Sequence, residues 1–400
     1  MDPTRRRLLG LVVAGALPGA LASARARSGG ELGTPGAPTP ARFASGARVG
    51  EGRHALVVVD ADGRLLREDA LPGRLHGAAS HRGRGLAAAF ARRPGEWFVL
   101  FDVAGGAPAR RVPVRRSRRI LGHGAFSADG RWLHTVENDF GGARGTLGVH
   151  DLADPARPRR VAEIPTGGTG PHDALRVPGT DLLVVANGGI ETHPDTGREK
   201  LNLPDMRPNV ALLEASPGAR PRRLAEWRLP DAWHRVSPRH LALSAGGRLW
   251  VGAQDEREPE DRARARAPLV ATAELADALR GAGTRPRTGG PVRLALDPVA
   301  LPEAAHDALA GYVSSIDATA GSVAVTSARG GAALLLDAGT RALAATLRLG
   351  DASGVAATDE PELGWRLTTG RGDFVAGDAL GLEPRRVHPF AWDNHLTRLS

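Results

Sequence analysis

The chain has 400 residues, no cysteine and a formal net charge of +9. The absence of cysteine excludes disulfides, iron–sulfur clusters, thiolate metal sites and covalent haem attachment. The excess positive charge comes from arginines scattered through many turns rather than from a basic tract, so we attribute it to codon bias and expect no nucleic-acid partner. Apolar residues make up 42% and aromatic residues 4%, which predicts a sizeable core of mainly Val, Leu and Ala.

Residues 1–27 have the composition of a cleavable export signal. Residues 5–7 are arginines, residues 8–21 are apolar, and residues 22–24 resemble a small-residue cleavage site. Paired arginines before a moderately apolar segment are typical of the twin-arginine export route. We therefore expect a periplasmic protein with no membrane span after cleavage. An uncleaved anchor is the alternative, although the apolar run is short and rich in Ala and Gly for a spanning helix.

A repeated unit follows. Residues 28–41 are rich in Gly, Pro and Thr and predict a flexible lead-in, whereas residues 42–400 are predicted to form one domain. Each repeat has a His or small residue, a short alternating strand, a turn with Gly and an apolar strand. The copies start at His76, His123, His172, His240, Ser315, Gly354 and His395. Intervals of 39 to 75 residues between the starts predict an all-β propeller of four-stranded blades, two of them with insertions.

Seven blades are expected. The stretch from Arg53 to Pro72 has the strand–turn–strand form of a blade but no inner strand before it. We expect the strand at His395 to supply the missing strand and so to close the ring. One alternative is an eighth blade hidden between His240 and Tyr312. A pair of β-sandwiches or an open repeat array are further alternatives, but neither explains the opening strand that recurs in every copy. Thr272–Gly281 is the one segment with a helical pattern.

The loop from Asn187 to Asn209 interrupts the repeat. It holds the only lysine, Lys200, the only internal methionine, Met206, and with Asn202 three of the five asparagines. In an Arg-, Ala- and Gly-rich chain, such rare residue types crowded together indicate that substitutes were not tolerated; chance clustering is the alternative. A loop of this length must cross a face of the disc, and we expect it to fold over the mouth of the central channel.

Two kinds of ligand suit this loop, together with His172. Its basic side chains suit an anion, and these are Arg198, Lys200 and Arg207. Its pair Glu191 and His193 suits a metal ion. A structural plug that satisfies backbone groups of the channel is the alternative.

Several stretches resemble a bacterial family known only as domain-of-unknown-function family 1513. They are residues 90–102, 122–151, 170–175, 186–208, 237–243 and 326–331. The resemblance implies a twin-arginine-exported seven-bladed propeller related to surface-layer and lactonase-like propellers. It also implies partners among periplasmic imelysin-like proteins of iron uptake, and it brings no established activity.

Because the first strand of each propeller blade lines the central channel, the histidines that open the repeats are expected to form a ring at one mouth. The ring would consist of His76, His123, His172, His240 and His395. Neutral imidazoles suit copper, zinc or iron, and we expect the first four as the metal ligands. The alternative is that each imidazole hydrogen-bonds a neighbouring blade, and a one-residue slip in register would turn a side chain away.

Polar residues flank the same strands and complete the candidate ligand site. They are Glu137, Asn138, Asp139, Asn187, Arg239, Gln254, Asp255, Asp393 and Asn394. Glu137 and Asp139 are candidate metal ligands or a general base beside His123, with solubilising acidic turns as the alternative. No G-x-S-x-G, H-E-x-x-H or phosphate-loop motif occurs. We therefore expect a monomeric binding or scaffold propeller for iron or another metal; the alternative is a metal-dependent enzyme, either a lactonase-like hydrolase or a redox protein.

Overall fold

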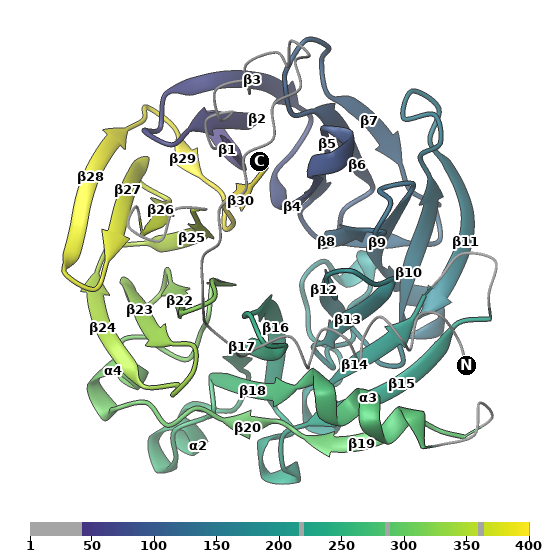
Figure 1. The fold of residues 1–400 in the computed structure, drawn as a ribbon, viewed down its shortest axis with the longest axis vertical. Coiled ribbons are helices and arrows are strands. Elements are labelled where there is room, and N and C mark those ends of the chain that lie inside the picture. The colour runs from purple at the N-terminus through teal and green to yellow at the C-terminus, as the bar shows by residue number, and fades with distance from the viewer. Residues whose placement is uncertain (1–41, 216–219, 285–288, 359–363, 400) are drawn as a thin grey trace, which may run out of the picture.

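The computed structural model describes residues 42–215, 220–284, 289–358 and 364–399. The predicted signal and lead-in, residues 1–27 and 28–41, lie outside these ranges. Seven sheets surround a central axis, which confirms the predicted all-β, seven-bladed propeller (Figure 1). No helix within the described ranges is both long enough and apolar enough to cross a membrane.

The blades are numbered in chain order, and their strands are given from the inside outwards. Blade 1 contains β29 (Ala391–Trp392) and β30 (Thr397–Arg398), then β1 (Arg42–Gly50), β2 (Arg53–Asp60) and β3 (Leu65–Leu71). Blade 2 contains β4 (Leu75–His81), β5 (Leu86–Ala91), β6 (Trp97–Asp102) and β7 (Arg110–Pro113). Blade 3 contains β8 (Arg119–Phe126), β9 (Trp132–Asp139), β10 (Arg144–Asp151) and β11 (Arg159–Pro165).

The second half of the ring continues the same pattern. Blade 4 contains β12 (Pro171–Arg176), β13 (Leu182–Asn187), β14 (Asn209–Glu214) and β15 (Arg222–Arg228). Blade 5 contains β16 (Val236–Leu243), β17 (Arg248–Asp255), β18 (Val270–Glu274) and β20 (Asp297–Pro298). Blade 6 contains β21 (Ser315–Ala318), β22 (Ser322–Ser327), β23 (Ala332–Asp337) and β24 (Leu343–Arg348). Blade 7 contains β25 (Ala352–Ala357), β26 (Trp365–Thr369), β27 (Asp373–Asp378) and β28 (Gly381–Val387).

The middle strands of the blades are buried on both faces, because each blade packs between two neighbours. β5, with the sequence LAAAFA, is buried along its whole length. One apolar cluster joins Leu147 and Val149 of blade 3 to Leu183 and Val185 of blade 4. The core therefore lies between the blades, and the strands that build it read as continuous apolar runs rather than as an alternating pattern.

The C-terminal segment closes the ring, as predicted. β29 and β30 pair antiparallel with β1, so that Trp392 lies opposite Ala47 and Thr397 lies opposite Ala44. The sequence pattern did not reveal β1, which lies between this closing segment and β2. Blade 1 is thus made of three N-terminal strands and one C-terminal inner edge.

The long fourth copy, which forms blade 5, contains no eighth blade. Its extra residues form α2 (Pro259–Arg264), α3 (Leu275–Gly283), α4 (Glu303–Asp307) and β19 (Val292–Ala295). β19 adds to the outside of blade 4, where it runs parallel to β15. The expected helix over 272–281 starts three residues later, because Thr272, Ala273 and Glu274 complete β18.

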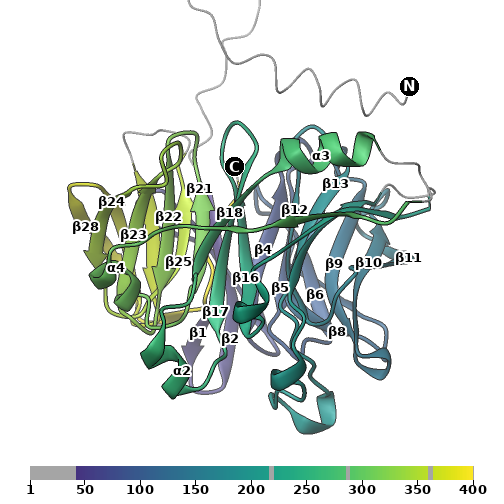
Figure 2. The same cartoon turned by 90° about the horizontal axis from the view of Figure 1, so that it is seen from below.

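The two ends of the disc differ. We call the end at which the inner strands begin the loop face. Asn187, at the end of β13, pairs with Pro171 at the start of β12, so the long loop over 188–208 leaves from this face. α2 follows β17 at the same face, whereas α3 lies at the opposite end (Figure 2).

A buried histidine ring as the candidate metal centre

The five histidines that open the repeats converge on the propeller axis. Successive ring centroids around the axis are 4.6 to 5.2 Å apart, in the order His76, His123, His172, His240, His395 and back to His76. Their side chains come from five different blades, and each residue is only 2 to 8% exposed. We call this set the histidine ring. Blades 6 and 7 supply Ser315 and Gly354 at the corresponding positions, which lets His240 and His395 meet across the gap.

Glycines beside the ring make this close packing feasible. Gly122 has a φ of 107°, and a Cβ added there would lie 2.3 Å from Cδ2 of His76. A Cβ at Gly77 would lie 2.7 Å from Nδ1 of His123. Both positions therefore need glycine for the imidazoles to approach one another.

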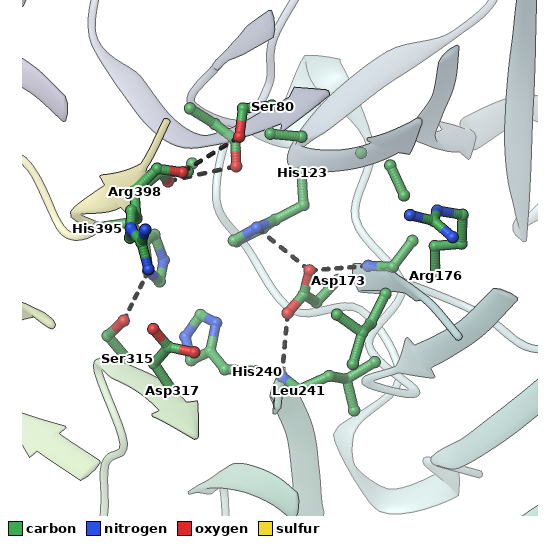
Figure 3. Close-up of a pocket in the computed structure, with 18 of the residues that line it drawn as sticks. Ser80, His123, Asp173, Arg176, His240, Leu241, Ser315, Asp317, His395 and Arg398 are labelled. Atoms are coloured by element: carbon green, nitrogen blue, oxygen red, sulfur yellow. Dashed lines mark hydrogen bonds and ion pairs between the residues drawn. The ribbon is translucent and has the colours of Figure 1, made fainter. Parts of the chain in front are cut away.

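Three ring members have their Nδ1 atoms in contact with side chains from other blades. Nδ1 of His123 lies 3.3 Å from Oδ1 of Asp173, and Nδ1 of His395 lies 3.2 Å from Oγ of Ser315 (Figure 3). Nη1 of Arg239 lies 3.3 Å from Nδ1 of His172. Carboxylates and hydroxyls that fix one imidazole nitrogen and leave the other directed at a shared centre are typical of the surroundings of metal ligands.

His172 and His76 form a pair within the ring. Because a guanidinium only donates hydrogen bonds, Arg239 requires Nδ1 of His172 to be the acceptor and places the proton on its Nε2. That Nε2 atom lies 3.4 Å from Nε2 of His76, where it donates a weak hydrogen bond. The Nε2 lone pair of His76 is therefore engaged, and Nε2 of His172 carries a proton.

His76 keeps a free Nδ1, and the remaining three members of the ring also carry free nitrogen atoms. Nε2 of His123, Nε2 of His395 and both nitrogens of His240 are buried without a hydrogen-bond partner among the described residues. The ligand atoms of this triad lie within 4.8 Å of one another, as do those of His76, His123 and His172. A tetrahedral zinc ion needs N···N separations of roughly 3.4 Å. Rotations of the imidazoles that move their nitrogen atoms by about an ångström would therefore complete the site. The free nitrogens favour His123, His240 and His395 over the predicted set, which omitted His395.

Burial keeps the ring uncharged. It lowers the pKa of His76, His172, His240 and His395 well below the usual value, and the neighbouring imidazoles lower these pKa values further. The pKa of His123 is also lowered by burial, against the opposing effect of Asp173. The imidazoles are consequently neutral at neutral pH, which is the form that binds metal ions.

A cavity of about 430 Å³ gives access to the ring from the side opposite the loop face. It is lined by the halves of the inner strands that lead away from that face, including Ser80, Asp173, Arg176 and Asp317 (Figure 3). His123, His240 and His395 form part of its wall. A small molecule in this cavity would therefore touch the same three histidines that carry free nitrogens.

The asparagines predicted for the site hold the long loop in shape. Nδ2 of Asn187 donates to Oδ1 of Asn209 at 2.8 Å across the base of the loop. Asn202 accepts from the backbone N–H of Glu191 at 2.7 Å and donates to the carbonyl of Gly189 at 2.9 Å. Asn138 of blade 3 donates to the carbonyl of Thr192 at 2.9 Å. The amides of Asn202 and Asn138 bond the loop backbone, and that of Asn187 bonds across the base of the loop, which agrees with the structural alternative for these residues.

Lys200 connects the loop to the ring through a carboxylate that the sequence did not single out. Its ammonium pairs with Glu256, whose other oxygen lies 3.3 Å from Nη2 of Arg239. Arg239 in turn contacts His172. The loop thus reaches the channel mouth through this chain of charges, with Met206 buried beneath it.

The structure does not place His193 and Arg207 of the loop at the ring. His193 packs edge-on against Phe140, and its Nδ1 lies 3.4 Å from Asp195. Arg207 is exposed and lines shallow pockets with Arg228 near the outer strands of blade 4. Among the described residues, the groups with metal-ligand geometry come from the histidine ring and not from Glu191 or His193.

The carboxylate beside His123 is Asp173, and not Glu137 or Asp139 as expected. Glu137 is fully buried and accepts from Thr135 at 2.6 Å and from Arg160 at 2.7 Å within blade 3. Asp139 is paired with arginines of the same blade, Arg118 and Arg144. These arginines hold both carboxylates within blade 3, and no interaction ties either of them to a ring histidine among the described residues. Oε2 of Glu137 is buried without a hydrogen-bond partner there.

Asp173, Ser315 and the pair Arg92–Arg93 are site residues that the sequence reading did not name. Asp173 directly follows His172, and a charged residue inside an opening strand was the signal available for it. Arg92 and Arg93 follow the buried strand β5 in the connection to β6, and no repeat pattern marks them. Their proximity to the ring comes from the folding of the blades around the axis.

A seven-bladed β-propeller with a buried polyhistidine centre is thus the class of protein defined by fold and site. Residues 69–399 match the family described as protein of unknown function (DUF1513), and the chain belongs to that family. No curated protein is significantly similar to it in sequence.

Two solved structures share the fold. A functionally unknown protein from Desulfotomaculum acetoxidans DSM 771 is 9% identical, with a TM-score of 0.56. A putative 6-phosphogluconolactonase from Bacteroides uniformis ATCC 8492 is 11% identical, with a TM-score of 0.58. In each comparison the alignment covers 90% of this chain and 99% of the other chain. At such identities the likeness establishes the fold alone.

Proposed function

We propose that this protein is an exported periplasmic propeller that binds a transition-metal ion at the histidine ring. The observation that carries the proposal is the set of free nitrogens on His123, His240 and His395, buried on the axis without hydrogen-bond partners among the described residues. A buried polar atom without a partner is costly, and a metal ion would satisfy three such atoms at once.

The chemistry of the donors narrows the choice of metal. Imidazole ligands without thiolates suit copper, zinc or iron, whereas magnesium and calcium prefer oxygen ligands. Asp173 and Ser315 support the ligand role by holding Nδ1 of His123 and His395. The site would hold its ion through three imidazoles and leave further coordination positions open toward the cavity.

The wider role is a proposal drawn from the sequence. The twin-arginine motif within residues 1–27 supports export to the periplasm. The resemblance to the family supports a role in iron acquisition or other metal handling, beside imelysin-like partner proteins. In this role the propeller would act as a monomeric metal-binding component or interaction scaffold and not as a catalyst.

Metal titration tests the proposal directly. Purified metal-free protein would be titrated with Zn²⁺, Cu²⁺ and Fe²⁺ by calorimetry, and the bound metal counted by mass spectrometry. We expect one ion per chain for at least one of these metals and loss of that ion in the double variant His123→Gln/His240→Gln.

His134→Gln is the matched control. His134 is a buried histidine of β9 outside the ring, and burial lowers its pKa to about 4. This variant should bind the metal like the parent protein. The proposal is wrong if none of the three metals binds, or if the ring variant, folded by circular dichroism, binds as well as the control.

The cavity beside the ring favours a second candidate, a metal-dependent enzyme. A space of about 430 Å³ in contact with His123, His240 and His395 is large enough for a small substrate. A lactonase-like hydrolase or a redox protein would use it. Assays of lactone hydrolysis and of dye reduction by the metal-loaded protein would distinguish a hydrolase from a redox protein. If turnover persists in His123→Gln/His240→Gln, the histidine ring is not the catalytic centre.

A further inference from the structure

A group of arginines lies over the histidine ring on the loop face. Arg92 and Arg93 come from the β5–β6 connection, Arg198 from the long loop and Arg239 from β16. We call these four residues the arginine collar. Arg239 touches the ring directly and is only 4% exposed, Arg92 and Arg93 are half-buried, and Arg198 is exposed.

The nearby carboxylates do not neutralise the collar. Glu256 is shared between Lys200 and Arg239, and Asp393 is engaged by Arg74. Within the described parts of the chain, the guanidinium groups of Arg92, Arg93 and Arg198 form neither an ion pair nor a hydrogen bond. This set of groups holds six cations, the four collar arginines with Lys200 and Arg74, and two carboxylates, so the set carries a net charge of +4 beside an uncharged ring.

Arg93 and Arg198 line one small pocket together. Burial, together with the nearby charges of Arg239 and Arg198, lowers the pKa of Arg93 to about 10 against the opposing effect of Glu256. Burial, Arg74 and Arg198 likewise lower the pKa of Arg92. Unpaired guanidiniums that are partly removed from water gain most from a ligand that supplies negative charge.

We propose that the arginine collar binds a small anion that carries several carboxylate or phosphate oxygens, held directly over the histidine ring. The planar fork of a guanidinium matches both oxyanions in a bidentate manner. The proposal rests on the proposed function in one respect: the anion would be the chelator with which the metal ion arrives. A free dication approaching this mouth meets a net positive charge, whereas a negatively charged metal chelate is attracted by it.

Anion binding without metal is the first test. Citrate and inorganic phosphate, each alone and at low ionic strength, would be titrated by calorimetry into the parent protein and into Arg93→Gln/Arg198→Gln. We expect one of the anions to bind the parent, and its affinity to fall roughly tenfold or more in the double variant, because charge-assisted hydrogen bonds are lost. The anion that binds more tightly identifies the carboxylate or the phosphate as the natural group.

Arg207→Gln is the control, because Arg207 is an exposed arginine of the same loop that lies away from the collar. Its affinity for the anion should equal that of the parent. The collar assignment is overturned if neither anion binds the parent, or if the double variant and the control bind equally well.

A second comparison separates this proposal from the metal site. Citrate alone should bind the ring variant His123→Gln/His240→Gln as it binds the parent, whereas zinc or ferric citrate should bind more tightly than citrate to the parent only. If the parent protein binds citrate but none of the metal ions, the proposed function is wrong and the anion site stands. Equal affinity of the parent for citrate and its metal complexes would overturn the chelate as ligand.

Discussion

Five imidazoles within a few ångströms of one another remain compatible with folding only because none of them is charged. Burial and mutual repulsion lower the pKa of His76, His172, His240 and His395. Protonation of one ring member would place a cation beside Arg92 and Arg239, with Asp173 as the carboxylate in contact with the ring. Neutrality of the ring is therefore linked to the stability of the fold.

This linkage predicts acid sensitivity of the metal-free protein. Above pH 6.5 the ring histidines are neutral in both the folded and the unfolded chain, whereas below it the unfolded chain takes up protons first. The free energy of unfolding should fall between pH 6.5 and 5 by about 1.4 kcal/mol per pH unit for each ring histidine that stays neutral. Urea unfolding at several pH values measures this, and His240→Gln should reduce the slope; an unchanged slope would contradict the assignment.

Comparison of two aspartates distinguishes residues that orient a ring histidine from residues that only connect adjacent blades. Asp173 accepts from the backbone N–H of Leu241 in the next blade and also contacts His123. Asp317 accepts from the N–H of Ala357 in its own next blade, and no interaction ties it to a ring histidine among the described residues. Both therefore connect adjacent inner strands, but only Asp173 positions a candidate ligand.

Asp173→Asn should consequently weaken metal binding while Asp317→Asn leaves it unchanged. Loss of the carboxylate that orients a ligand imidazole typically costs about 10- to 100-fold in metal affinity. Competition with a chromophoric chelator measures the affinity, and thermal unfolding shows whether the two variants are equally folded. Equal metal affinity of the two variants would show that Asp173 has only the structural role.

At the scale of elements, the loop over 188–208 is an ordered cover and not a flexible lid. It contains two short 3-10 turns, Pro194–Thr196 and Leu203–Asp205, and the side chain of Asn202 ties its two halves together. Lys200 then fixes it to Glu256 of blade 5. The loop carries Arg198 to the collar because these bonds hold its path.

Asn202→Ala should loosen this loop without unfolding the propeller. Two hydrogen bonds to the loop backbone are lost, which corresponds to about 1–3 kcal/mol of local stability. Hydrogen exchange by mass spectrometry should show faster exchange in peptides that cover residues 188–208 and unchanged exchange in β22 and β23. Unaltered protection of the loop would mean that Lys200 and the buried Met206 suffice to hold it.

For the whole molecule, stability depends on the strand that closes the ring. Trp392 is 3% exposed and packs with Phe43, Phe374 and Phe390 between blades 7 and 1. The closing segment also carries His395 into the histidine ring. Closure and assembly of the candidate site are therefore the same event.

Trp392→Ala should destabilise the protein by about 3–5 kcal/mol, the usual cost of removing a buried aromatic side chain. Leu380→Ala, at a turn of blade 7 where the side chain is 97% exposed, should change stability by less than about 0.5 kcal/mol. Chemical denaturation of both variants measures the difference. Similar losses in the two would show that the ring is not held by its closing segment.

Particular residues show how far the sequence alone could lead. The recurring opening strand and the unpaired segment from Arg53 to Pro72 were sufficient for seven blades and for closure by the C-terminal strand. The sequence pattern did not predict β1, because RFASGARVG combines small and charged residues. The burial of this strand comes from the neighbouring blades and not from its own hydrophobicity. The asparagines of the loop were conspicuous, but their hydrogen bonds to the loop backbone needed coordinates.

The sequence by itself determined the repeat, the number of blades and the alignment of five histidines at one position of that repeat, because strand periodicity and turn chemistry are local properties. The tertiary structure alone decided which nitrogens of the ring are free, that Asp173 and Arg239 hold His123 and His172, and that Arg93 and Arg198 line one pocket. These relations join residues from different blades, and the distances between such residues depend on how the blades pack around the axis.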